Sequence, residues 1–457
     1  MVYTYMRHVF LQMHAWELIF VTKATVFFIY LAGSRCGSCK VGYYRSGGNI
    51  CAICPNTPPA LLVAVLVAIL IGLSVALLVM IKLGRYFAAI SIAINYFQIL
   101  YIFKGLFLNW SSSVLQMFEI FSFFSFNIEL ASPECINPSI NYFSKGEFMF
   151  MLPPVILFFM TFVSIMSAPP FTYPLIYLKS RIKKQSYIYP QISWDVIQSN
   201  MKNSVRAFHI LLQFMYVSLT TWALGFFNCY EFGGTYVMTK APVFECYKGE
   251  HLENMPYFTM AVIFYVVGIP LYFSTLYFII YQTKFKGQFA LNLKRLVELF
   301  VRSDTSIYKP ATQFIVSVQL IMKLVILLVG NFMSDQISSQ AVIIQFAIFV
   351  YVGFLIYFKP YVQNDHTLAD LICQVCSVVT LGCGILFLTN TDNSSSSQRV
   401  QALTAIVIAT TSACVLCAVV FVAKDLHRGS KLLTEKLVED KRKSVAKTSR
   451  LSRTSGF

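Results

Sequence analysis

The stretch "QLIMKLVILLVG", residues 319 to 330, decides the class of fold. It lies within a segment, 311 to 332, that is long and apolar enough to cross a hydrocarbon core, which needs about 20 residues. Its only charged side chain is Lys323, and an unpaired charge at bilayer depth costs about 2.5 to 3.5 kcal/mol. The segment predicts a transmembrane helix in which Lys323 faces other helices and meets an acid or a set of carbonyls.

The whole chain has the composition of a membrane protein. Hydrophobic residues make up 57% of it and charged residues only 12%, whereas a soluble domain carries about 25% charged residues. We therefore expect an all-α polytopic integral membrane protein, at the plasma membrane or an endomembrane. The expected spans number nine and lie near 60–81, 87–108, 149–178, 207–227, 257–281, 311–332, 340–358, 368–390 and 400–423.

The basic residues give these spans an orientation. If the stretch before Ala60 is extracellular or luminal, most of the 36 Lys and Arg residues fall in inner loops and in a cytosolic C-terminal tail. That asymmetry is what the positive-inside rule predicts. The net charge of +16 then reflects membrane orientation and does not indicate binding to nucleic acid.

The N-terminal part holds "RCGSCKVGYYRSGGNICAICP", residues 35 to 55, in which Cys36, Cys39, Cys51 and Cys54 form two C-x-x-C pairs. Such spacing suits a structural zinc or two disulfides. The predicted orientation favours disulfides, because these persist outside the cytosol. We expect residues 1–34 to be a signal peptide or an N-terminal hydrophobic anchor and 35–58 to be a small disulfide-rich extracellular module.

The predicted orientation also sorts the other cysteines, into those on the outer side and those within apolar segments. Cys229 and Cys246 bracket a loop on the outer side and should form a disulfide, while Cys135 is left over there. Cys373 and Cys376 form another C-x-x-C inside an apolar segment, but no second ligand pair is near. We interpret these two as packing residues and predict no metal site and no cofactor.

A polar stripe interrupts the region between the second and third spans. Its residues recur at every third position, so they wind around a helix instead of staying on one face. They are Ser113, Gln116, Glu119, Ser122 and Ser125. The segment predicts either an interfacial amphipathic helix or a re-entrant element that lines an aqueous path. In the second case Glu119, Lys323 and the membrane-boundary residue Asp370 are the candidate permeation residues.

Several blocks resemble a family of large protist membrane proteins. They are "IAINYFQILYIFKGLFLNWSSSVLQMFEIFSFFSFNIELASPEC", "NCYEFGGTYVMTKAPVFECYKGEH", "YVVGIPLYF" and "IYFKPYVQNDHTLADLICQVCSVVTLGCGILF". With the preceding ephrin-receptor-like cysteine module, they are similar to proteins with a transient receptor potential (TRP)-like channel domain. The resemblance implies that 59–425 is a TRP-like transmembrane domain and that the chain is a cation-permeable ion channel, gated by an unknown stimulus and assembled as a homo-oligomer.

Two other functions stay open. A solute carrier of the flavin-carrier type would use the same prolines, such as Pro270, as breaks for alternating access, where a channel would use them as gating hinges. A non-conducting cell-surface receptor is the third possibility. An enzyme is not expected, because the sequence contains no P-loop, G-x-S-x-G, H-E-x-x-H or kinase signature.

The remaining signals concern the surface. Asn109 and Asn393 begin N-glycosylation sequons in loops assigned to the outside. The basic tail, 426–457, starts as an amphipathic helix and ends as a serine-rich segment beside the cytosolic leaflet. Such a tail should attract anionic lipids, and otherwise acts as a positive-inside anchor.

Overall fold

The helical elements of the chain carry most of its described residues. The computed structural model describes residues 31–32, 38–39, 43–46, 50–54, 72, 88–106, 108–125, 140–166, 194–281, 307–333, 336–388 and 395–454. The chain divides into two compact units. Unit 1 comprises Met1–Leu66, Asn127–Phe150 and Thr221–Ile263, and unit 2 comprises Val67–Phe126, Met151–Thr220 and Phe264–Phe457.

Seven helical stretches in the described part of the chain are long and apolar enough to cross a membrane. They are Tyr142–Phe162, Ser204–Phe227, Gly249–Ile279, Ile315–Phe332, Ile337–Phe358, Asn364–Leu388 and Gln398–Lys431. This confirms a mostly helical integral membrane protein. The predicted span near 60–81 lies outside the described residues except for Gly72, and the predicted span 87–108 is the shorter apolar helix Ala88–Lys104.

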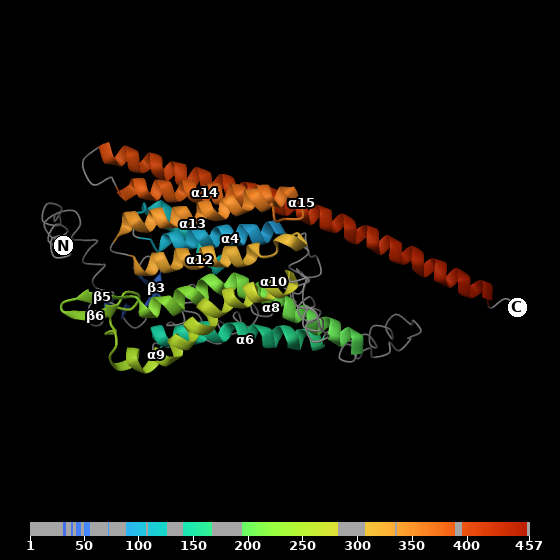
Figure 1. The fold of residues 1–457 in the computed structure, drawn as a ribbon, viewed down its shortest axis with the longest axis horizontal. Coiled ribbons are helices and arrows are strands. Elements are labelled where there is room, and N and C mark those ends of the chain that lie inside the picture. The colour runs from blue at the N-terminus through green and yellow to red at the C-terminus, as the bar shows by residue number, and fades with distance from the viewer. Residues whose placement is uncertain are drawn as a thin grey trace. The chain divides into compact units, whose positions relative to one another are not determined.

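The helices bear the labels of Figure 1. Their bounds are α4 Ala88–Lys104, α5 Ser112–Phe121, α6 Tyr142–Met166, α8 Trp194–Phe227, α9 Gly249–Ala261, α10 Gly268–Tyr281, α12 Ile315–Phe332, α13 Ile337–Phe358, α14 Asn364–Leu388 and α15 Ser395–Thr454. A π-helical segment, Val262–Val267, joins α9 to α10, and a 3₁₀ turn, Ser122–Ser125, follows α5.

Helix ends follow local capping signals more closely than hydrophobicity. The predicted start of the third span, near 149, was too late, because α6 begins at Tyr142. The preceding residue, Asn141, caps the helix: its side chain accepts a hydrogen bond from the Ser144 backbone N–H (3.0 Å). Helix α13 ends at Phe358, and the next residue, Lys359, adopts a left-handed conformation (φ 43°) directly before Pro360.

The directions of the unit 2 helices agree with alternating membrane crossings. Helices α4 and α12 run in the same direction. Lys323, in the middle of α12, contacts Asn95 and Gln98 in the middle of α4, and Gly330, near the end of α12, packs against Leu106 just after the end of α4. Two spans that run in the same direction must be separated in the sequence by an odd number of membrane crossings. The candidate spans within α6, α8 and α9–α10 supply three.

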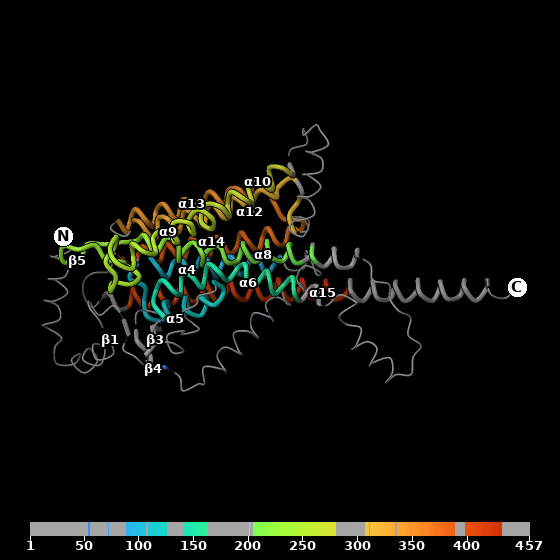
Figure 2. Tube along the Cα trace, turned by 90° about the horizontal axis from the view of Figure 1, so that it is seen from below, coloured from blue at the N-terminus to red at the C-terminus, as the bar shows by residue number. Residues whose placement is uncertain are grey.

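One close approach in unit 2 depends on a glycine. A Cβ atom on Gly384 of α14 would lie 2.6 Å from the Trp110 ring and 2.9 Å from Leu108. The Trp110 indole N–H donates to the Phe103 carbonyl (2.9 Å), which fixes the ring against this bare stretch of backbone. Helix α5 begins just after Trp110 and packs on α4, as the tube trace shows (Figure 2).

Helix α15 is 60 residues long and continues through the predicted boundary of the tail at residue 426 (Figure 1). Its C-terminal half is rich in Lys, Glu, Leu and Arg and contains no proline, a composition that favours helix. The serine-rich end of the predicted tail is therefore helical up to Thr454.

The described residues of unit 1 form three antiparallel strand pairs. They are β1 (Leu31–Ala32) with β2 (Ser38–Cys39), β3 (Tyr43–Ser46) with β4 (Ile50–Ile53), and β5 (Cys229–Phe232) with β6 (Thr235–Met238). The turn between β5 and β6 is Gly233–Gly234, with φ values of 59° and 81°. A two-residue hairpin turn of this type requires positive φ at both positions, which glycine adopts at little cost.

Candidate functional site

A set of buried polar side chains lies inside unit 2, where α4, α12, α13 and α14 pack together. We call this set the polar cluster. Its members are Asn95 and Gln98 of α4, Lys323 of α12, Tyr351 of α13, Tyr361 of the α13–α14 turn, and Asp370 and Gln374 of α14. Each is at most 5% exposed, so every charge and hydrogen bond here depends on protein partners.

Lys323 is held by two carboxamide oxygens. Its ammonium donates to Asn95 Oδ1 (2.6 Å) and to Gln98 Oε1 (2.7 Å). The two amides are three residues apart on α4 and therefore share one face of that helix. Short hydrogen bonds to a charged donor are about twice as strong as neutral ones, which offsets part of the cost of burying the ammonium. Lys323 thus faces other helices, as predicted, and its first partners are amides.

Gln98 is itself fixed in orientation. Its Nε2 donates to the backbone carbonyls of Phe214 in α8 (2.6 Å) and of Phe124 in the turn after α5 (3.2 Å). With Nε2 occupied by two carbonyls, Oε1 points at the Lys323 ammonium. The amide therefore links α12 to two further elements of the unit.

Asp370 accepts three hydrogen bonds from neutral donors. The hydroxyls of Tyr351 (2.9 Å) and Tyr361 (3.0 Å) donate to Oδ2, and Gln374 Nε2 donates to Oδ1 (3.1 Å). Burial and the neighbouring Asp370 carboxylate raise the pKa of Tyr361, which lies in the turn between two spans, well above its usual value. Tyr361 therefore remains a protonated donor at physiological pH.

Lys323 and Asp370 interact electrostatically without forming a direct ion pair. Each charge is bound instead by neutral groups, amides on one side and hydroxyls on the other. The cluster thus places a lysine and an aspartate in a low-dielectric interior, where the attraction between their charged forms is weakly screened. Removing either charge would leave the other uncompensated.

The polar face of α14 continues beyond the cluster. Gln374, Ser377 and Thr380 are buried and follow Asp370 at intervals of three and four residues, which places them on one side of the helix. Within the described residues, Gln374 Oε1 and Thr380 Oγ1 have no hydrogen-bond partner. Buried polar groups of this kind normally bind ordered water or an ion.

A second pair of buried polar side chains lies at one end of α14. Nε2 of His366 in α14 lies 2.9 and 3.0 Å from the carboxylate oxygens of Asp425 in α15, and both side chains are 2% exposed. The Ala89 backbone N–H, in the first turn of α4, donates to the same carboxylate (3.4 Å). A carboxylate at a helix N-terminus is favourable because it faces unpaired N–H groups. Asp425 therefore joins α4, α14 and α15.

Glu119, the third candidate permeation residue, lies outside the polar cluster. It forms an ion pair with Lys104 at the end of α4, and its side chain is 29% exposed. In the polar stripe, Ser113 and Gln116 are exposed on α5, whereas Ser122 and Ser125 are buried in the 3₁₀ turn that follows it. The structure thus brings Lys323 and Asp370 together and leaves Glu119 with Lys104.

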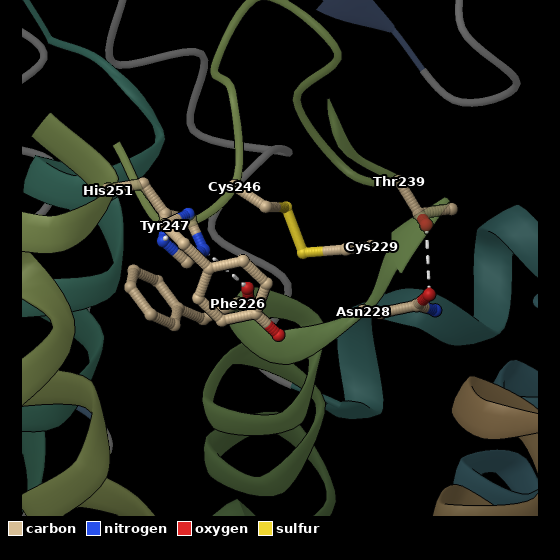
Figure 3. Close-up of a disulfide and its surroundings, with 7 residues drawn as sticks. All are labelled: Phe226, Asn228, Cys229, Thr239, Cys246, Tyr247 and His251. Atoms are coloured by element: carbon tan, nitrogen blue, oxygen red, sulfur yellow. Dashed lines mark hydrogen bonds between the residues drawn. A yellow bond between two sulfur atoms is a disulfide. The ribbon is translucent and has the colours of Figure 1, made fainter. Parts of the chain in front are cut away.

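The disulfide between Cys229 and Cys246 in unit 1 confirms the predicted pair (Figure 3). His251 lies beside it, with Nε2 3.1 Å from the Phe226 carbonyl oxygen and Nδ1 accepting from the Tyr247 backbone N–H (3.1 Å). The two sulfurs and one His251 nitrogen lie within 4.8 Å of one another. Because the sulfurs are bonded to each other, neither is a thiolate that could bind a metal.

Other predicted site residues are only partly described. Cys54 is disulfide-bonded, but its partner is not among the described side chains. Cys36, Cys135 and Asn393 lie outside the described residues, as do the side chains of Cys39 and Cys51 on β2 and β4. Asn109 is exposed, and Pro270 lies in α10 just after the π-helical segment.

Sequence reasoning missed most partners in the polar cluster. Asn95 and Gln98 carried a signal, namely two amides three residues apart in an otherwise apolar helix. It also missed that Cys414 of α15, which forms another C-x-x-C with Cys417, contacts Cys373. The prediction that no second ligand pair is near did not foresee this contact.

No protein-family model matches the chain, and no curated protein and no solved structure shows significant similarity to it.

Proposed function

We propose that the protein is a cation-permeable ion channel of the TRP-like kind that its sequence blocks resemble. The observation that carries the proposal is the polar cluster, which holds a buried lysine and a buried aspartate on two candidate membrane-spanning helices. Ionisable residues within spans are costly, and in membrane proteins they mark ion or substrate paths. The continued polar face of α14, with its unpaired oxygens, extends such a path beyond Asp370.

In this proposal Lys323 acts as a tethered cation. Its ammonium is coordinated by two carboxamide oxygens and lies in the field of Asp370, an arrangement that suits a permeant monovalent cation equally well. While the ammonium occupies this position, it repels other cations and holds the path closed. Displacing it, by a shift of α12 relative to α4, exposes the oxygens and the carboxylate to ions from solution.

The setting of the site adds support. The proposed orientation places the N-terminus and the Cys229–Cys246 loop outside the cell or in the lumen, and α15 extends into the cytosol. Its basic extension would attract anionic lipids of the cytosolic leaflet. We further propose a homo-oligomer, since polytopic channels commonly assemble from several copies around one or more paths.

A carrier is the second candidate, and one observation favours it. Both charges of the polar cluster are bound on all sides by protein groups, as in the occluded state of a transporter. A carrier would expose this site to the two sides alternately, with the π-helical segment and Pro270 providing a break in the fifth predicted span.

Reconstitution of the purified protein in planar bilayers separates these functions. The channel proposal predicts unitary currents whose reversal potential, in a KCl gradient, lies near the potassium equilibrium value. Saturable solute uptake into liposomes, without unitary currents under stretch, lipid or calcium stimuli, would select the carrier and contradict the channel. A protein that gives neither currents nor uptake would contradict both.

A further inference from the structure

Three cysteine side chains meet where α14 and α15 cross. Cys414 of α15 and Cys373 of α14 are 1% and 4% exposed, and their sulfurs lie 3.4 Å apart, in contact but not bonded. Cys376, one turn further along α14, is close enough to Cys414 for the two thiols to interact. The spacing of three residues places Cys373 and Cys376 on one face of α14, so Cys414 faces both of them.

The packing of the two helices holds the three thiols in place. Helices α14 and α15 are antiparallel neighbours, and the buried contact between His366 and Asp425 ties them together about two turns from Cys373. The Tyr96 hydroxyl is next to Cys414 and to the Thr411 hydroxyl, but neither hydroxyl makes a well-formed hydrogen bond among the described residues. The register that brings the sulfurs together is thus set by contacts outside the thiol group itself.

Only one of the three thiols is partly exposed. Cys376 has intermediate exposure, whereas Cys373 and Cys414 are buried. A small oxidant dissolved in the bilayer or at its surface therefore reaches Cys376 first. Cys414 is then the nearest thiol that can react with the product.

We propose that Cys414 is the central residue of a reversible oxidation site in which it forms a disulfide with Cys376 or Cys373 and so links α14 covalently to α15. A disulfide carries no charge and suits a membrane interior. A metal bound to the same sulfurs would require thiolate anions, which are costly to place in a low-dielectric interior.

The reaction balances with a peroxide as oxidant. The partly exposed Cys376 thiol transiently gives up its proton, its sulfur attacks hydrogen peroxide, and the O–O bond breaks. The leaving hydroxide takes up that proton and departs as one water, and a sulfenic acid remains on Cys376. The Cys414 sulfur then attacks the Cys376 sulfur, the S–O bond breaks, and the Cys414 proton leaves with the hydroxide as a second water. Two thiols lose two electrons, and the peroxide is reduced to two waters. Cys373 can afterwards attack the Cys414 sulfur and release Cys376 by thiol–disulfide exchange.

A cleavable full-length chain tests the proposal. A protease site inserted in the connection 389–394 separates α14 from α15 after digestion, and the Cys229–Cys246 disulfide stays within one fragment. After treatment with hydrogen peroxide and digestion of the folded, monodisperse protein, we expect the two fragments to run as one band on a non-reducing gel. Dithiothreitol should separate them.

Variants identify the thiols. Cys414→Ser and the double variant Cys373→Ser/Cys376→Ser should give separate fragments after oxidation, while Cys417→Ser should stay linked as the matched control. The proposal is overturned if the oxidised wild-type chain separates, or if the link persists without Cys414 or without both cysteines of α14. Monodispersity of each variant on size exclusion shows that loss of the link is not loss of the fold.

Discussion

The contact between Lys323 and Asn95 leads to a quantitative prediction. Asn95→Leu replaces the amide with an apolar side chain of similar size and removes one of the two acceptors of the ammonium. A hydrogen bond to a charged group contributes about 1.5 to 3 kcal/mol, so we expect a loss of stability in that range. Lys323→Met removes the ammonium and leaves two buried carboxamide oxygens and the Asp370 carboxylate uncompensated, and breaking such a buried arrangement costs about 3 to 5 kcal/mol.

The double variant decides whether the two residues act through this contact. With both changes, the Asn95 oxygen is no longer left unpaired, so the combined loss should fall short of the sum by about 0.5 to 3 kcal/mol. The assay is denaturant unfolding of the four proteins in lipid nanodiscs, with the same probe and lipid throughout. Losses that add to within about 0.5 kcal/mol would refute the reasoning, because they would show that the ammonium is not bound to Asn95.

Three further predictions concern other contacts. Gly384→Ala places a methyl group against the Trp110 ring that packs on α14. The change should destabilise unit 2 by about 1 to 3 kcal/mol, which would be measured as a lower Tm. Cys229→Ser with Cys246→Ser should cost about 3 kcal/mol, and dithiothreitol should then lower the Tm of the wild-type protein by more than it lowers that of this variant. Asp425→Ala should speed hydrogen exchange at the first turn of α4, whereas Asp365→Ala, at an exposed ion pair, should change it little.

The class of fold was readable from the sequence because the bilayer imposes one requirement on every span. In lipid, an apolar stretch such as 319–330 forms all of its backbone hydrogen bonds within itself only as a helix. The length of the helix that spans the membrane is set by the thickness of the hydrocarbon core. The same physics placed Lys323 toward the interior, since an ammonium facing lipid would go unpaired. These inferences need only local composition.

The partners of Lys323 and Asp370 could not be predicted in the same way. Asn95 is 228 residues away in the sequence, and which helix face it shares with Lys323 depends on how α4 packs on α12. Tyr361 belongs to a short turn whose direction is set by the left-handed Lys359. Hydrophobic patterning reports that a side chain is buried but not which element covers it.

Among the cysteines, one pairing could be predicted from the sequence and one contact could not. The Cys229–Cys246 disulfide was predictable because the two residues bracket one loop that the predicted orientation assigns to an oxidising compartment. The contact of Cys414 with Cys373 was missed, although both belong to C-x-x-C pairs, because the register between α14 and α15 fixes it. Sequence spacing alone does not give a register between helices.

The conductance of Lys323→Met tests the central claim most directly. Single-channel recording should compare it with the wild-type protein and with Lys104→Met, which removes a lysine of α4 that is paired with Glu119 outside the polar cluster. The account predicts that Lys323→Met increases open probability or cation conductance, since the tethered ammonium no longer occupies the site, while Lys104→Met conducts like the wild type. Identical conductance and gating in all three proteins would contradict the claim that the polar cluster lies on the ion path.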